Sequence, residues 1–161
     1  MKILMTSDRI PWQQDKIIRH SQRLLSSYHH WTEHYLLDPN GERAELAELL
    51  FVAPFVLVSH GTEPDPIFNY ANHKALQLRE ISWEDFTQMP SRKSAPDIVQ
   101  QERTSFLSEA ATKGFSSNYS SIRISSTDSR FYIENTTLWN VLDEQNQRCG
   151  QAAMFSKWKY I

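Results

Sequence analysis

The segment His30-Trp31-Thr32-Glu33-His34 has the spacing of an inverted zinc-peptidase motif, in which two histidines and a glutamate share one helix. A catalytic zinc needs a third protein ligand as well as an open coordination position. The other histidines of the chain stand in no partner motif at useful spacing. A helical projection turns His30 and His34 away from the apolar stripe of their own helix, and Glu33 further into solvent. We therefore predict a solvated helix surface here and no metal site.

Other familiar catalytic arrangements are also missing from the sequence. The four glycines stand singly, so no loop could hold a phosphate in the manner of a P-loop or a dinucleotide-binding turn. No G-x-S-x-G nucleophile elbow occurs. Cys149 falls in a predicted strand without an obvious histidine partner, which favours a small buried residue over a nucleophile.

Length and composition indicate one globular domain. The chain has 161 residues, of which 40% are hydrophobic, and this is enough to bury a sizeable core. A net charge of −2 provides no broad positive field, so nucleic acid is not expected as a direct partner. A single cysteine suits a reducing compartment, and we expect a cytoplasmic protein.

We expect neither a targeting segment nor a membrane anchor. The N-terminal stretch MKILMTSDRIPWQQDK contains only a very short apolar run before polar residues. The longest apolar run, Leu49 to Val58, is too short to span a bilayer and is interrupted by Pro54.

The first predicted element is a helix from Pro11 to about Leu37, ended by the sequence DPNG. Its apolar seam recurs at spacings of four and three residues. The stripe is broad enough to pack either on a sheet of the same chain or on a second copy of itself. A homodimer through this helix would use the aromatic-rich seam, which comprises Ile17, Leu24, Tyr28, Trp31 and Tyr35.

The remaining chain alternates helices and strands in an α+β order. Residues 42–51 form a short helix, residues 55–59 and 67–70 two strands, and residues 72–80 a helix. Ser82 caps a short helix, with Asp85 three residues later as in a capping box, and Asp97 caps a longer helix that ends at Gly114. Three strands complete the chain at residues 118–125, 130–142 and 148–158.

Two strands, a run of helices and a three-stranded meander form the element order of a PAS domain. Together, the segments PIFNYAN, SWEDF, MPSRKSA, RFYIENTTLWNVLDE and GQAAMF resemble the MEKHLA domain, a PAS-related family. The resemblance covers about residues 12–158. It implies an antiparallel five-stranded sheet with helices over one face, and an extra N-terminal helical segment that could cover the other. We divide the chain into an N-terminal helical flank, residues 1–53, and a PAS-like core, residues 54–161.

The resemblance implies a noncatalytic sensory or protein-interaction module with an unknown signalling partner. Flavin-photochemical PAS domains carry a reactive cysteine in an Asn-Cys-Arg-Phe-Leu motif, whereas this chain has MPSRKSA in that region. A cysteinyl-flavin adduct of that type is therefore excluded. No histidine lies in the long helix before the final strands, so haem is not supported. We expect no tightly held cofactor, and a small, noncovalently bound organic molecule is the ligand that these observations leave open.

The strand at residues 130–142 carries polar side chains where a core would be apolar. Simple alternation puts Phe131, Ile133, Thr137, Trp139 and Val141 on one face and Tyr132, Glu134, Thr136, Leu138 and Asn140 on the other. The mixed face could line a cavity between sheet and helices, or it could be partly solvated or hold a hydrogen-bonded core pair. The predicted cavity residues are Tyr70, Phe86, Arg92, Tyr132 and Glu134.

Arg92, Arg123 and Arg130 are candidate partners for Glu134, although surface positions are the commoner role of arginine. A second function class uses the same cavity: a small α+β enzyme with Glu134 as its acid–base group and Tyr132 or Arg92 nearby. The absence of paired carboxylates, an activated nucleophile and a metal shell favours the noncatalytic module.

Overall fold

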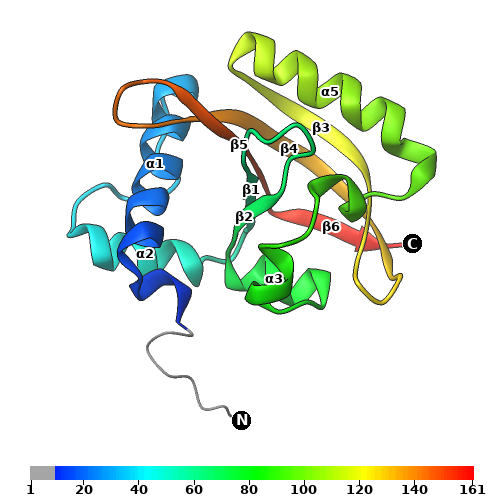
Figure 1. The fold of residues 1–161 in the computed structure, drawn as a ribbon, viewed down its shortest axis with the longest axis horizontal. Helices are drawn as coiled ribbons and strands as arrows, with labels where there is room; N and C mark the ends of the chain where they lie inside the picture. The colour runs from blue at the N-terminus through cyan, green and yellow to red at the C-terminus, as the bar shows by residue number, and fades with distance from the viewer. Residues whose placement is uncertain (1–9) are drawn as a thin grey trace.

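A computed structural model describes residues 10–161, so the first nine residues of the predicted flank, including the stretch MKILMTSDR, lie outside the described residues. The chain begins with helical elements and then forms a sheet interrupted by further helices (Figure 1). The helical elements are η2 (Pro11–Gln13), α1 (Asp15–Thr32), α2 (Arg43–Phe51), α3 (His73–Arg79), α4 (Trp83–Phe86), η3 (Ser91–Ser94), η4 (Asp97–Val99) and α5 (Gln100–Lys113). The strands are β1 (Val56–His60), β2 (Phe68–Ala71), β3 (Phe115–Ile124), β4 (Arg130–Leu142), β5 (Arg148–Phe155) and β6 (Lys157–Tyr160).

The strands form one antiparallel sheet in the order β2-β1-β5-β4-β3, with β6 joined to β4. The α+β class and the PAS-like order are confirmed, but the prediction of five strands is wrong. The expected last strand, residues 148–158, is broken at Ser156, and the chain then continues as β6. Because β6 pairs with Phe131–Glu134, while β5 pairs with Thr137–Leu142, the two strands share one side of β4.

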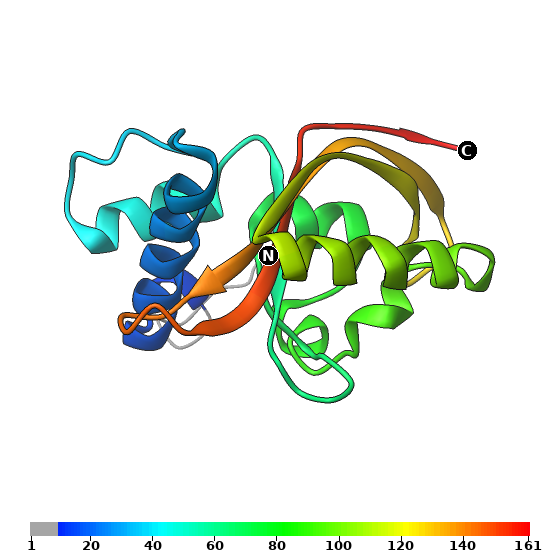
Figure 2. The same ribbon diagram turned by 90° about the horizontal axis from the view of Figure 1, so that it is seen from above.

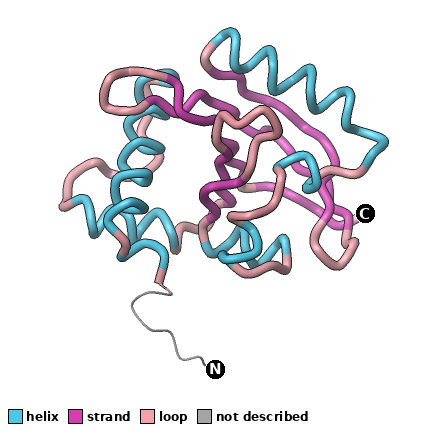
Figure 3. The backbone as a smooth tube through the Cα atoms, in the orientation of Figure 1, coloured by secondary structure: helices cyan, strands magenta, loops and turns pink. Residues whose placement is uncertain are grey.

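Helices cover both faces of this sheet. Viewed from above, α1 and α2 lie on one side of the strands and α3 and α5 on the other (Figure 2). The tube view shows the same separation between the N-terminal helices and the later ones (Figure 3). Each face has its own buried core. The face under α3 and α4 holds Val56, Val58, Phe68, Phe86, Phe131, Ile133 and Phe155, and the face under α1 holds Leu24, Leu50, Leu57, Tyr70, Trp139, Val141 and Ala152.

Local capping explains where several helices begin. The Asn72 side chain accepts from the Ala75 N–H at the start of α3, and Ser82 accepts from the Asp85 N–H at the start of α4, as its sequence position predicted. The prediction that Asp97 caps the long helix is wrong, because Asp97 starts the separate 3₁₀ turn η4 and α5 begins only at Gln100. Gly114 does end α5, with a positive φ of 102° that glycine adopts without strain.

Helix α1 is shorter than predicted. It ends at Thr32 because Glu33 takes a left-handed conformation with φ 63°, five residues before the DPNG sequence. His34 therefore lies beyond the helix, and the expected H-x-x-E-H pattern is not carried by a continuous helix. No helix within residues 10–161 is both long enough and apolar enough to cross a bilayer.

A bulge in β4 overturns the predicted alternation of its side chains. Asn135 has φ 51°, and the pairing of β3 with β4 shifts register around Tyr119. The extra residue reverses the faces of the strand from that point on. Phe131 and Ile133 consequently share the α3 and α5 side with Leu138 rather than with Trp139, which lies under α1.

Candidate functional site

A cavity of about 40 Å³ lies between the sheet and the helices of the α3–α5 layer. Five of the six strands contribute to its wall, together with α3, η3 and α5. Apolar side chains form much of the lining, among them Val58, Phe68, Leu107, Ile133, Leu138 and Phe155. The polar lining consists of Ser59, His60, Arg79, Ser94, Arg103, Tyr119, Arg123, Thr136 and Gln151.

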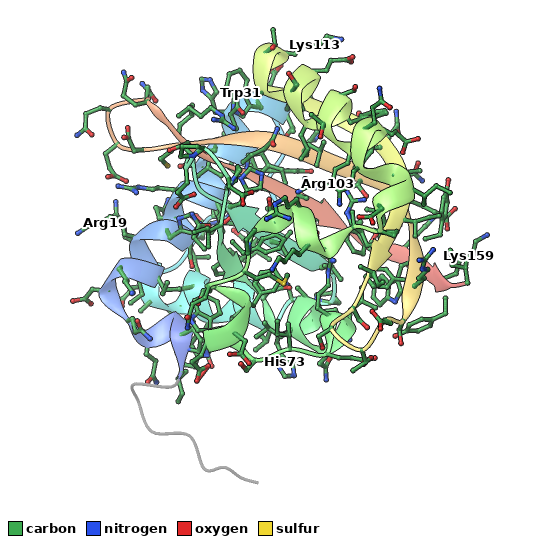
Figure 4. All side chains as sticks on the ribbon, turned by 45° about the vertical axis from the view of Figure 1, so that its right-hand side comes forward. Arg19, Trp31, His73, Arg103, Lys113 and Lys159 are labelled. Carbon is green, nitrogen blue, oxygen red and sulfur yellow. The ribbon has the colours of Figure 1, made fainter. Side chains whose placement is uncertain are left out.

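Three arginines from three different elements reach this cavity, and all are buried. Arg79 ends α3, Arg103 lies in the first turn of α5, and Arg123 lies near the end of β3; their exposed fractions are 4%, 8% and 6%. Figure 4 shows Arg103 in the middle of the molecule, whereas Lys113 lies at its edge. Burial of three cationic side chains around one small cavity is unusual, because arginine is seldom buried without a charged partner.

The arginines are held in place by neutral groups. Arg79 Nη1 donates to the Ser94 carbonyl at 3.1 Å, and Arg103 Nη2 donates to Ser91 Oγ at 3.1 Å. Arg123 donates to the Ile122 carbonyl at 2.8 Å and to the Tyr119 hydroxyl at 2.9 Å.

Two of the guanidinium groups retain an unpartnered N–H. Within the described residues, Arg79 Nε and Arg103 Nε are buried and have no hydrogen-bond partner, and the same holds for the hydroxyl of Thr136. Burial, and then the charges of Arg123 and Arg103, lowers the pKa of Arg79 to about 9. Burial and the charge of Arg123 likewise lower the pKa of Arg103 to about 10. A lowered arginine pKa means that the surroundings of the side chain in the folded protein destabilise its charged form.

The structure does not bring the predicted cavity residues together at this site. Tyr70 lies on the opposite face of the sheet, in the core under α1, and Arg92 is exposed and paired with Asp65 at 3.2 Å. Phe86 stacks on Phe68 with ring centroids 4.1 Å apart and belongs to the core beside the cavity rather than to its wall.

Tyr132 and Glu134 are also outside the cavity, and the bulge explains why. They lie opposite Lys159 and Lys157 of β6, and the ammonium of Lys159 sits 5.8 Å from the centre of the Tyr132 ring. The polar residue of β4 that does reach the cavity is Thr136, one residue after Asn135. The prediction of Tyr132 and Glu134 as cavity residues is therefore wrong, because it assumed uninterrupted alternation.

The spacing of apolar and buried residues in the sequence could have indicated that two of the arginines, Arg103 and Arg123, face the core. Arg103 stands at helical spacing from Phe106, Leu107 and Ala110, which form the inward stripe of α5. Arg123 alternates with the buried Ser121 and Tyr119 along β3. Both patterns put an arginine at a core position, where sequence reasoning assumed the commoner surface role.

The seam of α1 packs on the sheet of its own chain. Ile17 and Leu24 are buried there, Tyr28 meets Trp139 edge-on with ring centroids 4.9 Å apart, and Trp31 lies partly buried. Tyr35 lies outside the helix, is 57% exposed, and stacks on His29. Of the two arrangements open for this stripe, the structure shows the intramolecular one, and a homodimer stays a prediction.

The histidines of the opening motif are separated from one another. His30 is exposed and its ring meets Trp31 edge-on, and His34 lies exposed in the chain beyond α1. Across residues 10–161 no three histidine, cysteine or acidic side chains gather in a way that could hold a metal ion.

A family model for the MEKHLA domain matches residues 18–160, nearly the whole described chain. The chain belongs to the MEKHLA domain family. The comparison with curated proteins gave no match.

Solved structures show that this MEKHLA domain has a PAS-like fold. A PAS domain from Colwellia psychrerythraea aligns with a TM-score of 0.61 at 15% identity, over 73% of this chain and 94% of that one. A fungal light-oxygen-voltage photoreceptor domain aligns with 0.58 at 12%, over 93% and 96%. A PAS domain in complex with ethanol, from a LuxR-family regulator of Burkholderia thailandensis, aligns with 0.52 at 13%, over 71% and 95%.

Asn140 connects the two helical layers of the MEKHLA domain. Its side chain donates to the Ala111 carbonyl in α5 at 2.9 Å, and its backbone N–H donates to the Gly114 carbonyl at 2.8 Å. Its own carbonyl accepts from Trp31 Nε1 of α1 at 2.9 Å. The C-terminal end of α5, the helix that carries Arg103, is thereby joined through one residue of β4 to α1 on the other face.

Proposed function

We propose that this MEKHLA domain is a noncatalytic sensory module that holds a small molecule in the arginine-lined cavity and reports its presence through α1. The observation that carries the proposal is the cavity lined by Arg79 and Arg103, each of which has a buried N–H group without a partner among the described residues. Buried polar groups are normally satisfied, and a ligand is one way to supply the missing partners.

The dimensions of the cavity support a ligand of only a few atoms. A water needs roughly 10–15 Å³ of cavity measured in this way, so 40 Å³ corresponds to about three or four non-hydrogen atoms. Sites for drug-sized molecules and large cofactors have volumes of hundreds of Å³. A flavin of the kind used by light-oxygen-voltage domains is therefore poorly supported, in agreement with the absence of a cysteine between Met89 and Ala95.

The position of α1 supports its assignment as the reporting element. Besides the bridge through Asn140, His20 Nε2 of α1 lies 2.8 Å from the hydroxyl of Ser59, a residue of the cavity lining. A change in the position of β1 or α5 on ligand binding would therefore alter contacts that α1 makes. No comparable arrangement supports the enzyme alternative, because Glu134, Tyr132 and Arg92 lie outside the cavity.

The test is thermal unfolding of the full chain with a panel of molecules of three to five non-hydrogen atoms: neutral alcohols and amides, small amines and small anions. At least one should raise the midpoint of the wild-type protein. The variant Ala153→Val adds two methyl groups to the wall of the cavity and should abolish that response. The active molecule should also slow amide hydrogen exchange in α1. Absence of any response in the wild type, or an unchanged response in Ala153→Val, would overturn the sensory proposal.

A further inference from the structure

The cavity combines three positive charges with no negative one. Its lining contains no aspartate or glutamate, and the ion pairs found within residues 10–161 involve other side chains: Arg23 with Glu144, Arg92 with Asp65 and Lys113 with Glu109. Buried charges in proteins are paired or solvated, because an isolated one is costly to remove from water. The three arginines therefore form a cation cluster without a counter-charge from the residues that the structure describes.

The unpartnered N–H groups belong to two arginines that line the same cavity. Arg79 and Arg103 use one terminal nitrogen each on neutral oxygens, from Ser94 and Ser91, and leave Nε buried and unpartnered. A guanidinium presents Nε–H and a terminal N–H side by side, and this fork matches the two oxygens of a carboxylate. The hydroxyl of Thr136 is a further unpartnered group in the same wall.

The rest of the cavity indicates which anion would fit. The space admits about three or four non-hydrogen atoms, and acetate has four. Leu107, Ile133, Leu138 and Phe155 also line it, and they suit a methyl group better than a second charged oxygen cluster. A tetrahedral phosphate is larger, carries more charge and would leave oxygens against this apolar wall.

We propose that the MEKHLA domain binds a short-chain monocarboxylate of about the size of acetate, whose carboxylate is held by Arg79, Arg103 and Arg123 and whose alkyl end contacts the apolar wall. This inference rests on the proposed sensory function and adds the chemical class of the ligand. The bound anion would be a counter-charge shared by the three arginines. Because these lie on α3, α5 and β3, the anion would hold the three elements together.

The first experiment titrates the full chain with sodium acetate and follows thermal unfolding at constant ionic strength. Sodium chloride, nitrate and phosphate are the anion controls, and acetamide is the neutral control of the same shape. The midpoint should rise saturably with acetate and stay unchanged with acetamide. Arg103→Gln and Arg79→Gln should weaken acetate binding at least tenfold, whereas Arg92→Gln, an exposed arginine outside the cavity, should leave it unchanged.

A second measurement on the wild-type protein does not depend on the folding of variants. In ¹⁵N-labelled protein, the Nε–H signals of Arg79 and Arg103 should shift downfield as acetate is added, because a carboxylate becomes their acceptor. An equal response to chloride would show only a general salt effect, and a response restricted to phosphate or nitrate would show a different oxyanion site; either would overturn the inference. A response to acetamide as large as that to acetate would also overturn it, yet would leave the sensory cavity standing. Absence of any response in the whole panel would overturn both proposals.

Discussion

Asn72 should contribute more to the stability of this domain than any ordinary helix cap. Its side-chain oxygen accepts from the N–H of Leu57 at 3.1 Å and from that of Ala75 at 3.2 Å. Its amide nitrogen donates to the carbonyls of Phe55 at 2.8 Å and Leu50 at 3.3 Å. One fully buried side chain thus joins the end of α2, the start of β1 and the first turn of α3.

We expect Asn72→Ala to lower the free energy of unfolding by about 4 kcal/mol. Loss of the cap costs about 1 kcal/mol. The N–H of Leu57 and the carbonyl of Phe55 are left buried without this partner, at about 1–2 kcal/mol each. The carbonyl of Leu50 adds less, because it also accepts from the N–H of Ala53 at 3.4 Å.

Urea unfolding at equilibrium measures this cost against a matched cap. With a slope of about 2 kcal/mol per M, the midpoint of Asn72→Ala should fall by about 2 M. Ser82→Ala also removes a helix cap, that of α4, but it breaks only one hydrogen bond. It should therefore cost about 1 kcal/mol. Asn72→Asp should not rescue the protein, since a carboxylate oxygen would face the two carbonyls. Equal losses in Asn72→Ala and Ser82→Ala would refute the bridging role.

Three further outcomes are expected. Burial, and to a smaller extent Arg23, lowers the pKa of His20 to about 4, so as pH falls the unfolded chain binds a proton before the folded one does. The free energy of unfolding should therefore fall by up to about 3 kcal/mol as pH drops from about 6.5 to 4, and by less in His20→Gln. Urea midpoints measured at several pH values would show this. Gly114→Ala should cost about 3 kcal/mol or more, because its Cβ would lie 2.5 and 2.7 Å from Trp31 Cε3 and Cη2. Gly41→Ala also stands at positive φ, but its Cβ would make only ordinary contacts with Leu46, the nearest at 3.9 Å, so it should cost less; thermal unfolding compares the two variants. Leu24→Glu puts a carboxylate into the core under α1 and should unfold the monomer, as sedimentation and circular dichroism would show; a folded variant with a changed association state would instead indicate a dimer seam.

Element order and helix chemistry could be predicted from local sequence because local physics decides them. Ser82 is followed by a helix whose third residue needs an acceptor, and Gly114 ends the amphipathic pattern of α5 with the conformation that glycine favours. The stripe of α1 is a property of its own spacing, and it required an apolar surface opposite. Which surface that is depends on tertiary packing, and only the structure shows that it is the sheet of the same chain.

The sequence did not predict the positions where a single residue ends a helix, bends a strand or buries a charge. Glu33 ends α1 through a left-handed conformation that non-glycine residues adopt uncommonly, so no breaker in the sequence marks it. Ser156 bends the last strand although β-forming residues continue on both sides. The burial of the three arginines was not predicted, because arginine usually lies at the surface. A charge at a core position can be interpreted as part of a site only when the cavity around it is known.

The bulge at Asn135 links these observations. Without it, strict alternation from Ile133 would continue through Asn135 and Thr137, and Trp139 would face the helices of the cavity layer. The extra residue instead places Thr136 and Leu138 in the cavity wall and turns Trp139 to α1, where it meets Tyr28. One strand thus supplies a wall to the cavity and a floor to the N-terminal helix within four residues. Because helices cover both faces of the sheet, alternation alone would place neighbouring residues of β4 on opposite sides, and the bulge decides which residues face the cavity and which face α1.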